Sequence, residues 1–224
     1  MSNFWKRFFA GFVFISLVLG SLLLGHLAFT LFFSVIVILS VLEFSKLLDK
    51  TGINGFSYIN VTLSLGFFFW GYLVSEQILD LASGLFFIPL IALLLWLTSL
   101  YSKLGGFHAI GSALISLFYI GTPFTLLHYL LFDITPPVIE SYQPGLIVLL
   151  FFMIWFNDSW AYISGKALGK RKLFPSVSPG KTWEGFIGGM LVTLLFSFVV
   201  SLYYTDFTQF DIIFMGLLMV VFGS

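Results

Sequence analysis

The stretch Asn157–Gly189, NDSWAYISGKALGKRKLFPSVSPGKTWEGFIGG, concentrates charged and hydroxyl side chains in an otherwise hydrocarbon-rich sequence. It begins with an Asn-Asp pair at the end of an apolar run and passes through five basic residues. It then re-enters apolar sequence at Glu184. We expect a protein that gathers acids, cations and hydroxyls in one window to carry out its chemistry there.

The composition predicts an integral membrane protein. Of the 224 residues, 59% are hydrophobic and only 9% are charged, whereas a soluble domain has about 25% charged residues. The chain has no cysteine, which excludes a disulfide framework and a thiolate metal site. The formal net charge is zero, so a simple polyanion-binding role is excluded and no nucleic-acid partner is expected.

The apolar runs predict an all-α, polytopic bundle of about eight transmembrane helices, each near the ~20 residues needed to span a bilayer. Pro123 should kink the fifth helix. Lys6 and Arg7 also resemble the start of a signal peptide, but no small-x-small cleavage site follows. The expected spans are residues 8–24, 27–42, 56–74, 81–100, 109–131, 145–162, 183–203 and from 210 onward.

The charges predict the topology, because cytoplasmic loops carry an excess of Lys and Arg. With the amino terminus in the cytoplasm, all ten cations fall on inside segments. The acids Glu76, Asp80, Asp133, Glu140, Asp206 and Asp211 fall outside. We therefore expect membrane helices over 1–145 and a site-bearing part over 146–224, with a cytoplasmic loop at 163–182.

Asp158 is the leading candidate metal ligand. Placing an acidic side chain at the centre of a membrane helix costs ~2.5–3.5 kcal/mol of free energy, so acids near membrane depth usually have a function. Asn157 offers an amide oxygen beside it, and oxygen ligands suit Mg²⁺, which proteins hold with one or two carboxylates plus substrate phosphates. The alternative is that Asp158 lies in headgroup water and has only a capping role.

The following loop has the features of a phosphate cradle. Hydroxyls, free N–H groups and one cation lead into a helix at Ser176, Ser178, Gly180, Lys181 and Thr182, an arrangement suited to binding phosphate. A P-loop is excluded, because its required first glycine falls on Pro175 and a membrane helix precedes the loop.

Several nearby charges have structural explanations as well. Glu184 near a helix N-terminus is favoured by the helix dipole, with Thr182 as the N-cap; it could equally hold a cation such as Lys181. Lys166, Lys170, Arg171 and Lys172 serve the positive-inside rule, attract anionic lipid, or bind a lipid phosphate or a triphosphate. We interpret His26, His108 and His128 as isolated interfacial or packing residues.

The window is similar to the phosphatidate cytidylyltransferase (CDP-diacylglycerol synthase) family. The resemblance rests on the ordered motifs Asn157-Asp158-Ser159-Trp160-Ala161-Tyr162, Gly165, Gly169-Lys170, Lys172-Leu173, Pro175, and Ser178-Pro179-Gly180-Lys181-Thr182-Trp183-Glu184-Gly185 with Gly188-Gly189. Outside this segment the first six spans resemble the family only in hydropathy and order.

The resemblance implies an enzyme of the inner (plasma) membrane, a homodimer that faces the cytoplasm and joins CTP to phosphatidic acid with Mg²⁺ among membrane lipids. It implies Asp158 as metal ligand and phosphate contacts for Ser178, Lys181 and Thr182. We therefore expect catalytic roles for Asp158, Lys181 and Ser178. We expect substrate-binding roles for Asn157, Lys170, Lys172, Ser176, Gly180, Thr182 and Glu184.

The family pattern continues into a second acidic cluster that ends in Asp-Arg-x-Asp. This cluster does not occur before Ser224, so the resemblance predicts a carboxyl-terminal truncation and, if that is natural, an inactive chain with an assembly role. Two other classes stay open. One is a CTP-dependent kinase of polyprenol or phytol, and the other is a transporter, since acids and glycines at membrane depth also mark ion paths.

Overall fold

The chain is a predominantly helical integral membrane protein that divides into two compact units, Met1–Pro144 and Gly145–Ser224. The structure, a computed structural model, describes residues 3–51, 57–101, 106–132, 142–176, 178–204 and 207–223. Within these ranges, five helices are long and apolar enough to cross a membrane: His26–Lys50, Ser57–Ser75, Ile110–Tyr129, Gly145–Leu168 and Trp183–Ser201. Shorter apolar helices cover Phe9–Leu23, Leu81–Leu93 and Gln209–Gly223.

The first two helices of the first unit are α1 (Asn3–Leu23) and α2 (His26–Lys50). Gly25 makes the turn between them with φ 109°, a conformation that glycine adopts without strain. The predicted loop after residue 42 is wrong for residues 43–50, which continue α2. No Gly or Pro interrupts this segment, and Glu43 and Lys46 form an exposed i,i+3 pair at 3.5 Å that is compatible with a helix.

The helix α3 (Ser57–Ser75) begins and ends within one residue of the prediction. The prediction of one continuous helix over 81–100 is wrong. The first part of this region is the 3₁₀ helix η1 (Leu81–Phe86), and only α4 (Phe87–Tyr101) is α-helical. Pro89 lies in the first turn of α4, where a missing N–H costs no helical hydrogen bond. The α-helix therefore begins just before this proline.

The fifth predicted span consists of three segments, namely α5 (Gly106–Ser116), a π-helical segment η2 (Leu117–Gly121) and α6 (Thr122–Tyr129). Pro123 lies two residues after the end of η2, and a proline inside a helix removes a backbone hydrogen bond. The Thr122 hydroxyl donates to the Leu117 carbonyl at 3.1 Å. The sequence predicted a kink at Pro123; the structure has a π-helical turn on the N-terminal side of this residue.

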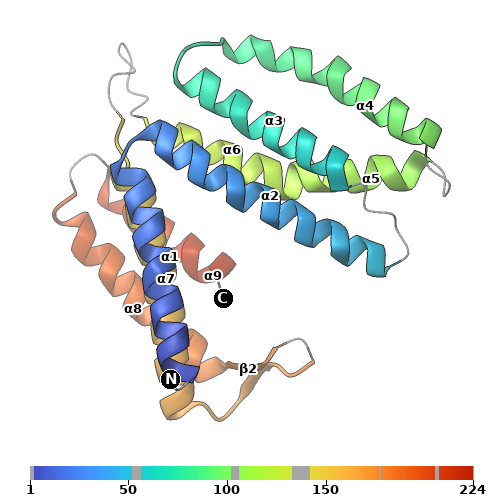
Figure 1. The fold of residues 1–224 in the computed structure, drawn as a ribbon. Coiled ribbons are helices and arrows are strands. Elements are labelled where there is room, and N and C mark those ends of the chain that lie inside the picture. The colour runs from blue at the N-terminus through green and yellow to red at the C-terminus, as the bar shows by residue number, and fades with distance from the viewer. Residues whose placement is uncertain are drawn as a thin grey trace. The chain divides into compact units, whose positions relative to one another are not determined.

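The second unit comprises α7 (Gly145–Leu168), a hairpin of β1 (Lys172–Phe174) and β2 (Ser178–Thr182), α8 (Trp183–Ser201) and α9 (Gln209–Gly223). The three helices pack against one another (Figure 1). Their buried core joins Leu149 and Met153 of α7 to Ile212 of α9. Flanking side chains come mainly from α8 and α9: Phe196, Val200, Tyr204, Met215 and Met219.

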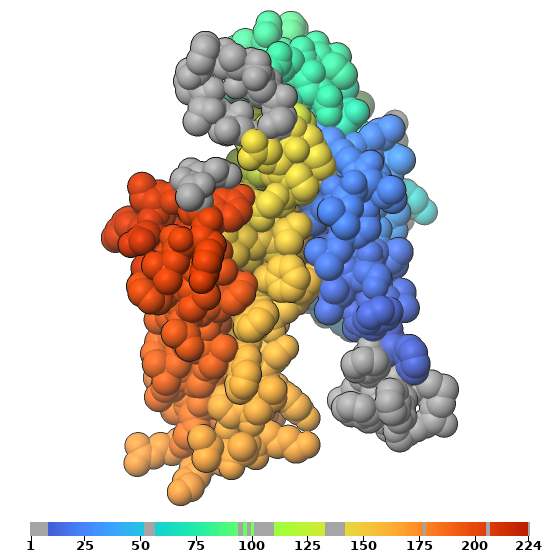
Figure 2. All heavy atoms as spheres, turned by 90° about the vertical axis from the view of Figure 1, so that its left-hand side faces the viewer, coloured from blue at the N-terminus to red at the C-terminus, as the bar shows by residue number. Residues whose placement is uncertain are grey.

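Two boundary predictions in this unit are wrong. Helix α7 runs six residues past Tyr162 to Leu168, so Asn157 and Asp158 lie within a helix and not at its end. The predicted loop over 163–182 contains the antiparallel pair β1–β2, in which Lys172 faces Thr182 and Phe174 faces Ser178. In Figure 2 the orange atoms of this region project from one end of the second unit.

Close packing of α7 on α8 depends on glycine at Gly185, Gly188 and Gly189. A Cβ on Gly185 would lie 2.7 Å from the Ala161 carbonyl oxygen and 3.1 Å from Gly165 Cα. A Cβ on Gly189 would lie 2.8 Å from the backbone oxygen of Asn157. Small residues thus let the two backbones approach, as at other membrane helix contacts.

The part of the chain that the structure describes does not include Lys103, Asp133, Glu140 or Asp206. These four charges entered the topology prediction. The assignment of about eight spans with a cytoplasmic amino terminus therefore stays a prediction.

Candidate active site

Helix α7 presents the Asn-Asp pair on two neighbouring faces. Asn157 is buried with 1% exposure, whereas Asp158 is exposed. Successive helical residues point about 100° apart, so one side chain enters the packed interior and the next leaves it. Asn157 packs closely against Gly189 of α8 and lies near Gly223 of α9. A Cβ atom added at Gly189 would be 2.8 Å from Asn157 Oδ1, and one added at Gly223 would be 3.6 Å from Asn157 Nδ2.

The hairpin enters α8 through Thr182. Its side-chain oxygen accepts a hydrogen bond from the Gly185 amide at 3.2 Å, so Thr182 is the N-cap of α8, as the sequence predicted. The Trp183 amide donates to the Arg171 carbonyl at 3.0 Å, which closes the base of the hairpin. This geometry brings β2, with Ser178 and Lys181, to the N-terminal end of α8.

A cavity of about 400 Å³ lies within the second unit, between the α7 face that bears Asp158 and the hairpin. It collects six of the predicted site residues: Asn157, Asp158, Ser178, Gly180, Lys181 and Thr182. It is also lined by Lys166, which was predicted as one of four cations that could bind a phosphate. The remaining lining residues had no predicted role: Ala161, Tyr162, Gly165, Leu173, Gly185, Phe186 and Gly223.

A helical signal for the missed residues is present in the sequence. Asp158, Tyr162 and Lys166 follow one another at i,i+4 spacing, which places them on one face of a helix. The Lys166 ammonium lies 5.9 Å from the centre of the Tyr162 ring, within range of a cation–π contact. Because the predicted span ended at residue 162, this face was not recognised beyond Tyr162.

The cavity has a mixed electrostatic character. Lys181 of β2 lies close enough to Asp158 to interact with it electrostatically, and Lys166 contributes a second ammonium group. One carboxylate and two ammonium groups therefore face the same space. The two ammonium groups favour binding of an anion. The Asp158 carboxylate can hold a metal cation that is bound to that anion.

Glu184 lies in the first turn of α8 behind the Thr182 cap, as the sequence predicted. Its carboxylate accepts hydrogen bonds from the backbone amides of Lys170 at 3.0 Å and Arg171 at 3.2 Å. It thereby fastens the segment that leads into β1 to the first turn of α8. Glu184 does not line the cavity described here, and neither do Lys170, Lys172 or Ser176.

The oxygen donors at the cavity fit a weakly coordinated hard cation. Among the described residues there is no group of three or more His, Cys, Asp or Glu side chains that could hold a metal ion. Among the residues that the structure describes at the cavity, Asp158 supplies the carboxylate, and the side chains of Asn157 and Ser178 lie nearby. Mg²⁺ is commonly held by one or two protein carboxylates together with substrate phosphates, and this donor set is compatible with that mode.

Several curated proteins are similar to parts of the chain. A phosphatidate cytidylyltransferase of Haemophilus influenzae is 56% identical over 57 residues, which cover 25% of this chain and 20% of the relative. Those of Staphylococcus aureus (strain COL) and Bacillus subtilis (strain 168) are 40% and 38% identical over 89 and 112 residues. These two matches cover 38% and 50% of this chain and 34% and 39% of the relatives.

The chain thus spans less than half the length of these relatives. No solved structure matches it. A model of the cytidylyltransferase family matches residues 5–224. Because this match covers almost the whole sequence, including both membrane units and the cavity between α7 and the hairpin, the chain belongs to the cytidylyltransferase family.

Proposed function

We propose that this protein is a phosphatidate cytidylyltransferase, which joins CTP and phosphatidic acid to give CDP-diacylglycerol and pyrophosphate. Family membership and the names of the similar proteins support the reaction class. The observation that carries the proposal for this chain is the cavity that brings Asp158, Ser178 and Lys181 together from α7 and β2.

In the proposed reaction, a phosphate oxygen of phosphatidic acid attacks the α-phosphorus of CTP. The bond from that phosphorus to the oxygen bridging it to the β-phosphorus breaks, and pyrophosphate leaves with this oxygen. Phosphoryl-type transfers depend mainly on positioning and charge stabilisation, not on covalent help from the protein. Lys181 and Ser178 are suited to bind triphosphate oxygens, and Gly180 leaves room for them.

Asp158 is the residue that would hold Mg²⁺, with Asn157 beside it. The bound ion supplies charge neutralisation on the triphosphate. The ammonium of Lys166 gives the cavity a second cation for an anionic group, which is either the nucleotide or the lipid headgroup. Thr182 acts through its cap on α8, which keeps β2 at the head of that helix.

The membrane setting completes the proposal. We infer about eight spans with a cytoplasmic amino terminus, an inner-membrane location and an active site at the cytoplasmic face, because the ten Lys and Arg residues fall on one side of that arrangement. CTP is available on that side, and phosphatidic acid enters from the bilayer. A homodimer is part of the same proposal.

The decisive experiment is Asp158→Asn in the intact protein, assayed in membranes with labelled CTP, phosphatidic acid and Mg²⁺. We expect CDP-diacylglycerol formation to fall by roughly 10²–10³-fold, the range for losing one group that stabilises transferring charge. The matched control is Asp80→Asn, which removes an acid whose side chain makes no capping hydrogen bond on η1. Near-normal product formation by Asp158→Asn would refute the ligand role.

The same assay separates the competing classes. A phosphorylated alcohol in place of a CDP-lipid would indicate the CTP-dependent kinase. Solute uptake into vesicles without any CTP-derived product would indicate a transporter. Neither alternative has support from the proteins that the chain resembles.

A further inference from the structure

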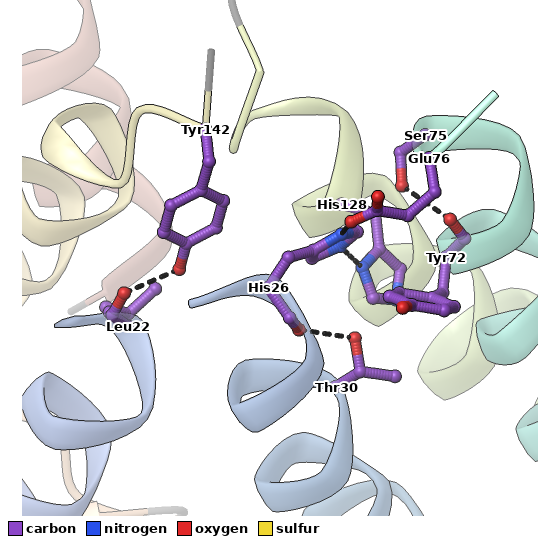
Figure 3. A network of polar contacts seen from close by, with 8 residues as sticks. All are labelled: Leu22, His26, Thr30, Tyr72, Ser75, Glu76, His128 and Tyr142. Carbon is purple, nitrogen blue, oxygen red and sulfur yellow. Dashed lines mark hydrogen bonds and ion pairs between the residues drawn. The ribbon is translucent and has the colours of Figure 1, made fainter. Parts of the chain in front are cut away.

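Three polar side chains from separate helices meet within the first unit (Figure 3). His26 begins α2, Glu76 follows α3, and His128 lies near the end of α6. His26 Nδ1 is 2.6 Å from Glu76 Oε1, and His26 Nε2 is 2.7 Å from His128 Nδ1. The three groups form a continuous hydrogen-bonded row across residues that are up to 102 positions apart in sequence.

The row lies in an aromatic environment. His26 and His128 are 6% and 0% exposed. The His26 ring is 4.7 Å from Tyr72 and 4.9 Å from Phe132 between centroids, and the His128 ring is 4.4 Å from Phe68. The Glu76 side chain is 34% exposed, so one end of the row reaches the surface. Ionisable groups buried in membrane proteins are costly and usually functional.

The positions of the protons follow from the pairing. With both imidazoles neutral, Glu76 accepts from His26 Nδ1–H, and His26 Nε2 accepts from His128 Nδ1–H. His128 Nε2 is then a buried lone pair without a hydrogen bond of ordinary geometry, and the Phe68 backbone lies within reach of this ring. A proton added at that nitrogen lets the Nδ1 proton of His128 pass to His26 Nε2. The positive charge then rests on His26, next to the Glu76 carboxylate.

Other titratable groups do not compete for this proton. Among the described residues, those that face the row are Tyr72 of α3 and Tyr142, both uncharged phenols near neutral pH. Tyr142 lies outside the membrane helices, where burial raises its pKa to about 12. Its hydroxyl donates to the Leu22 carbonyl at 2.6 Å. Glu76 is thus the charged group in contact with the histidine pair.

We propose that Glu76, His26 and His128 form a shared proton-binding site that joins α2, α3 and α6 at one end of the first unit. One proton binds to the pair of histidines as a unit, and the Glu76 carboxylate stabilises the bound form. Proton uptake converts the hydrogen bond between neutral His26 and the Glu76 carboxylate into an ion pair at 2.6 Å, which adds the attraction between two opposite charges. The contact between the three helices therefore tightens as the site is protonated.

The test is a pH titration of the intact protein in detergent, labelled with ¹⁵N on histidine, with the ring nitrogens observed by NMR. The chain has only three histidines, and His108→Gln removes the third to complete the assignment. We expect the signals of His26 and His128 to move together with one midpoint. Separate midpoints that differ by a unit or more would overturn the proposal.

The variant Glu76→Gln keeps the shape of the side chain and removes its charge. It should lower the shared midpoint by ~1 unit or more, since an opposite charge within 4–6 Å shifts a titration by 1–3 units. The folded wild type should bind the proton at a higher pH than folded Glu76→Gln does. As pH falls through the wild-type titration, the unfolding temperature of the wild type should therefore rise relative to that of Glu76→Gln. An unchanged histidine midpoint would contradict the proposal.

One measurement does not depend on any variant. A hydrogen bond between two imidazole nitrogens at 2.7 Å should give a direct nitrogen–nitrogen coupling in the labelled wild-type protein. Its observation supports the row, and its absence across the titration would overturn it. Neither result depends on cytidylyltransferase activity, so this proposal and the proposed function fail separately.

Discussion

The two units place their polar side chains in opposite ways. In the first unit, His26, Glu76 and His128 bond to one another among aromatic rings. In the second, Asp158 and Lys181 face a cavity of about 400 Å³. Both arrangements cost free energy in a membrane protein. The first recovers it through internal pairing, whereas the second leaves charged groups available to a ligand.

This difference shows how to read polar residues in an apolar chain. A buried polar group that is paired within the protein stabilises or switches the structure, whereas one that borders a cavity is available for chemistry. On helix α7, Asn157 is buried and Asp158 is exposed, and both residues border the cavity. Substitutions at the cavity test this difference between the units, because they show whether binding or folding depends on each side chain.

The largest effect beyond Asp158 is expected at Lys181. Lys181→Met should reduce CDP-diacylglycerol formation by about 10²-fold, because it removes a positive charge that would stabilise the triphosphate. Thermal stability should change little, since Lys181 is exposed. The measurement is the membrane assay with labelled CTP, alongside thermal unfolding of the purified variant.

Lys46→Met is the matched control for this prediction. Lys46 is an exposed lysine of the first unit, paired with Glu43 at 3.5 Å, and exposed ion pairs contribute little to stability. It should leave activity within about twofold of the wild type, as expected for a surface change. Equal losses in both variants would show that the assay responds to positive charge in general and not to the cavity.

A smaller effect is expected at the α7–α8 contact. Gly185→Ala should destabilise the protein by ~1–3 kcal/mol, the range for overpacking, because the new Cβ would meet the Ala161 carbonyl oxygen at 2.7 Å. The measurement is unfolding in detergent. Gly20→Ala is the control, since a Cβ at Gly20 has no atom within 4 Å. Unchanged stability of Gly185→Ala would contradict the close approach of the two helices.

The smallest effect is expected at Glu184. Glu184→Ala should speed hydrogen exchange at the Lys170 and Arg171 amides, which donate to its carboxylate. Glu184→Gln keeps one acceptor oxygen and should have a weaker effect. Mass spectrometry of exchanged protein provides the measurement. The Gly169 amide, which bonds to the Gly165 carbonyl at 3.0 Å, is the internal control. Equal acceleration there would indicate general loosening of the segment.

Much of the local structure could be predicted from the sequence. The bounds of α3, the turn at Gly25, the disturbance at Pro123 and the cap at Thr182 depend on neighbouring residues. Helix ends without a glycine or proline were less predictable. The continuations of α2 to Lys50 and of α7 to Leu168 were missed, because charged residues at helical spacing are compatible with both a loop and a helix.

The linear sequence was enough to show that this is a membrane protein, that charged and hydroxyl side chains concentrate between Asn157 and Gly189, and which family that stretch resembles. These conclusions rest on composition, on neighbouring residues and on motif order, all of which are present in the linear chain. Only the tertiary structure decided that Glu184 bonds to the Lys170 and Arg171 amides and that His26 lies against His128. Such partners are chosen by the packing of helices far apart in sequence, and no local pattern specifies that packing.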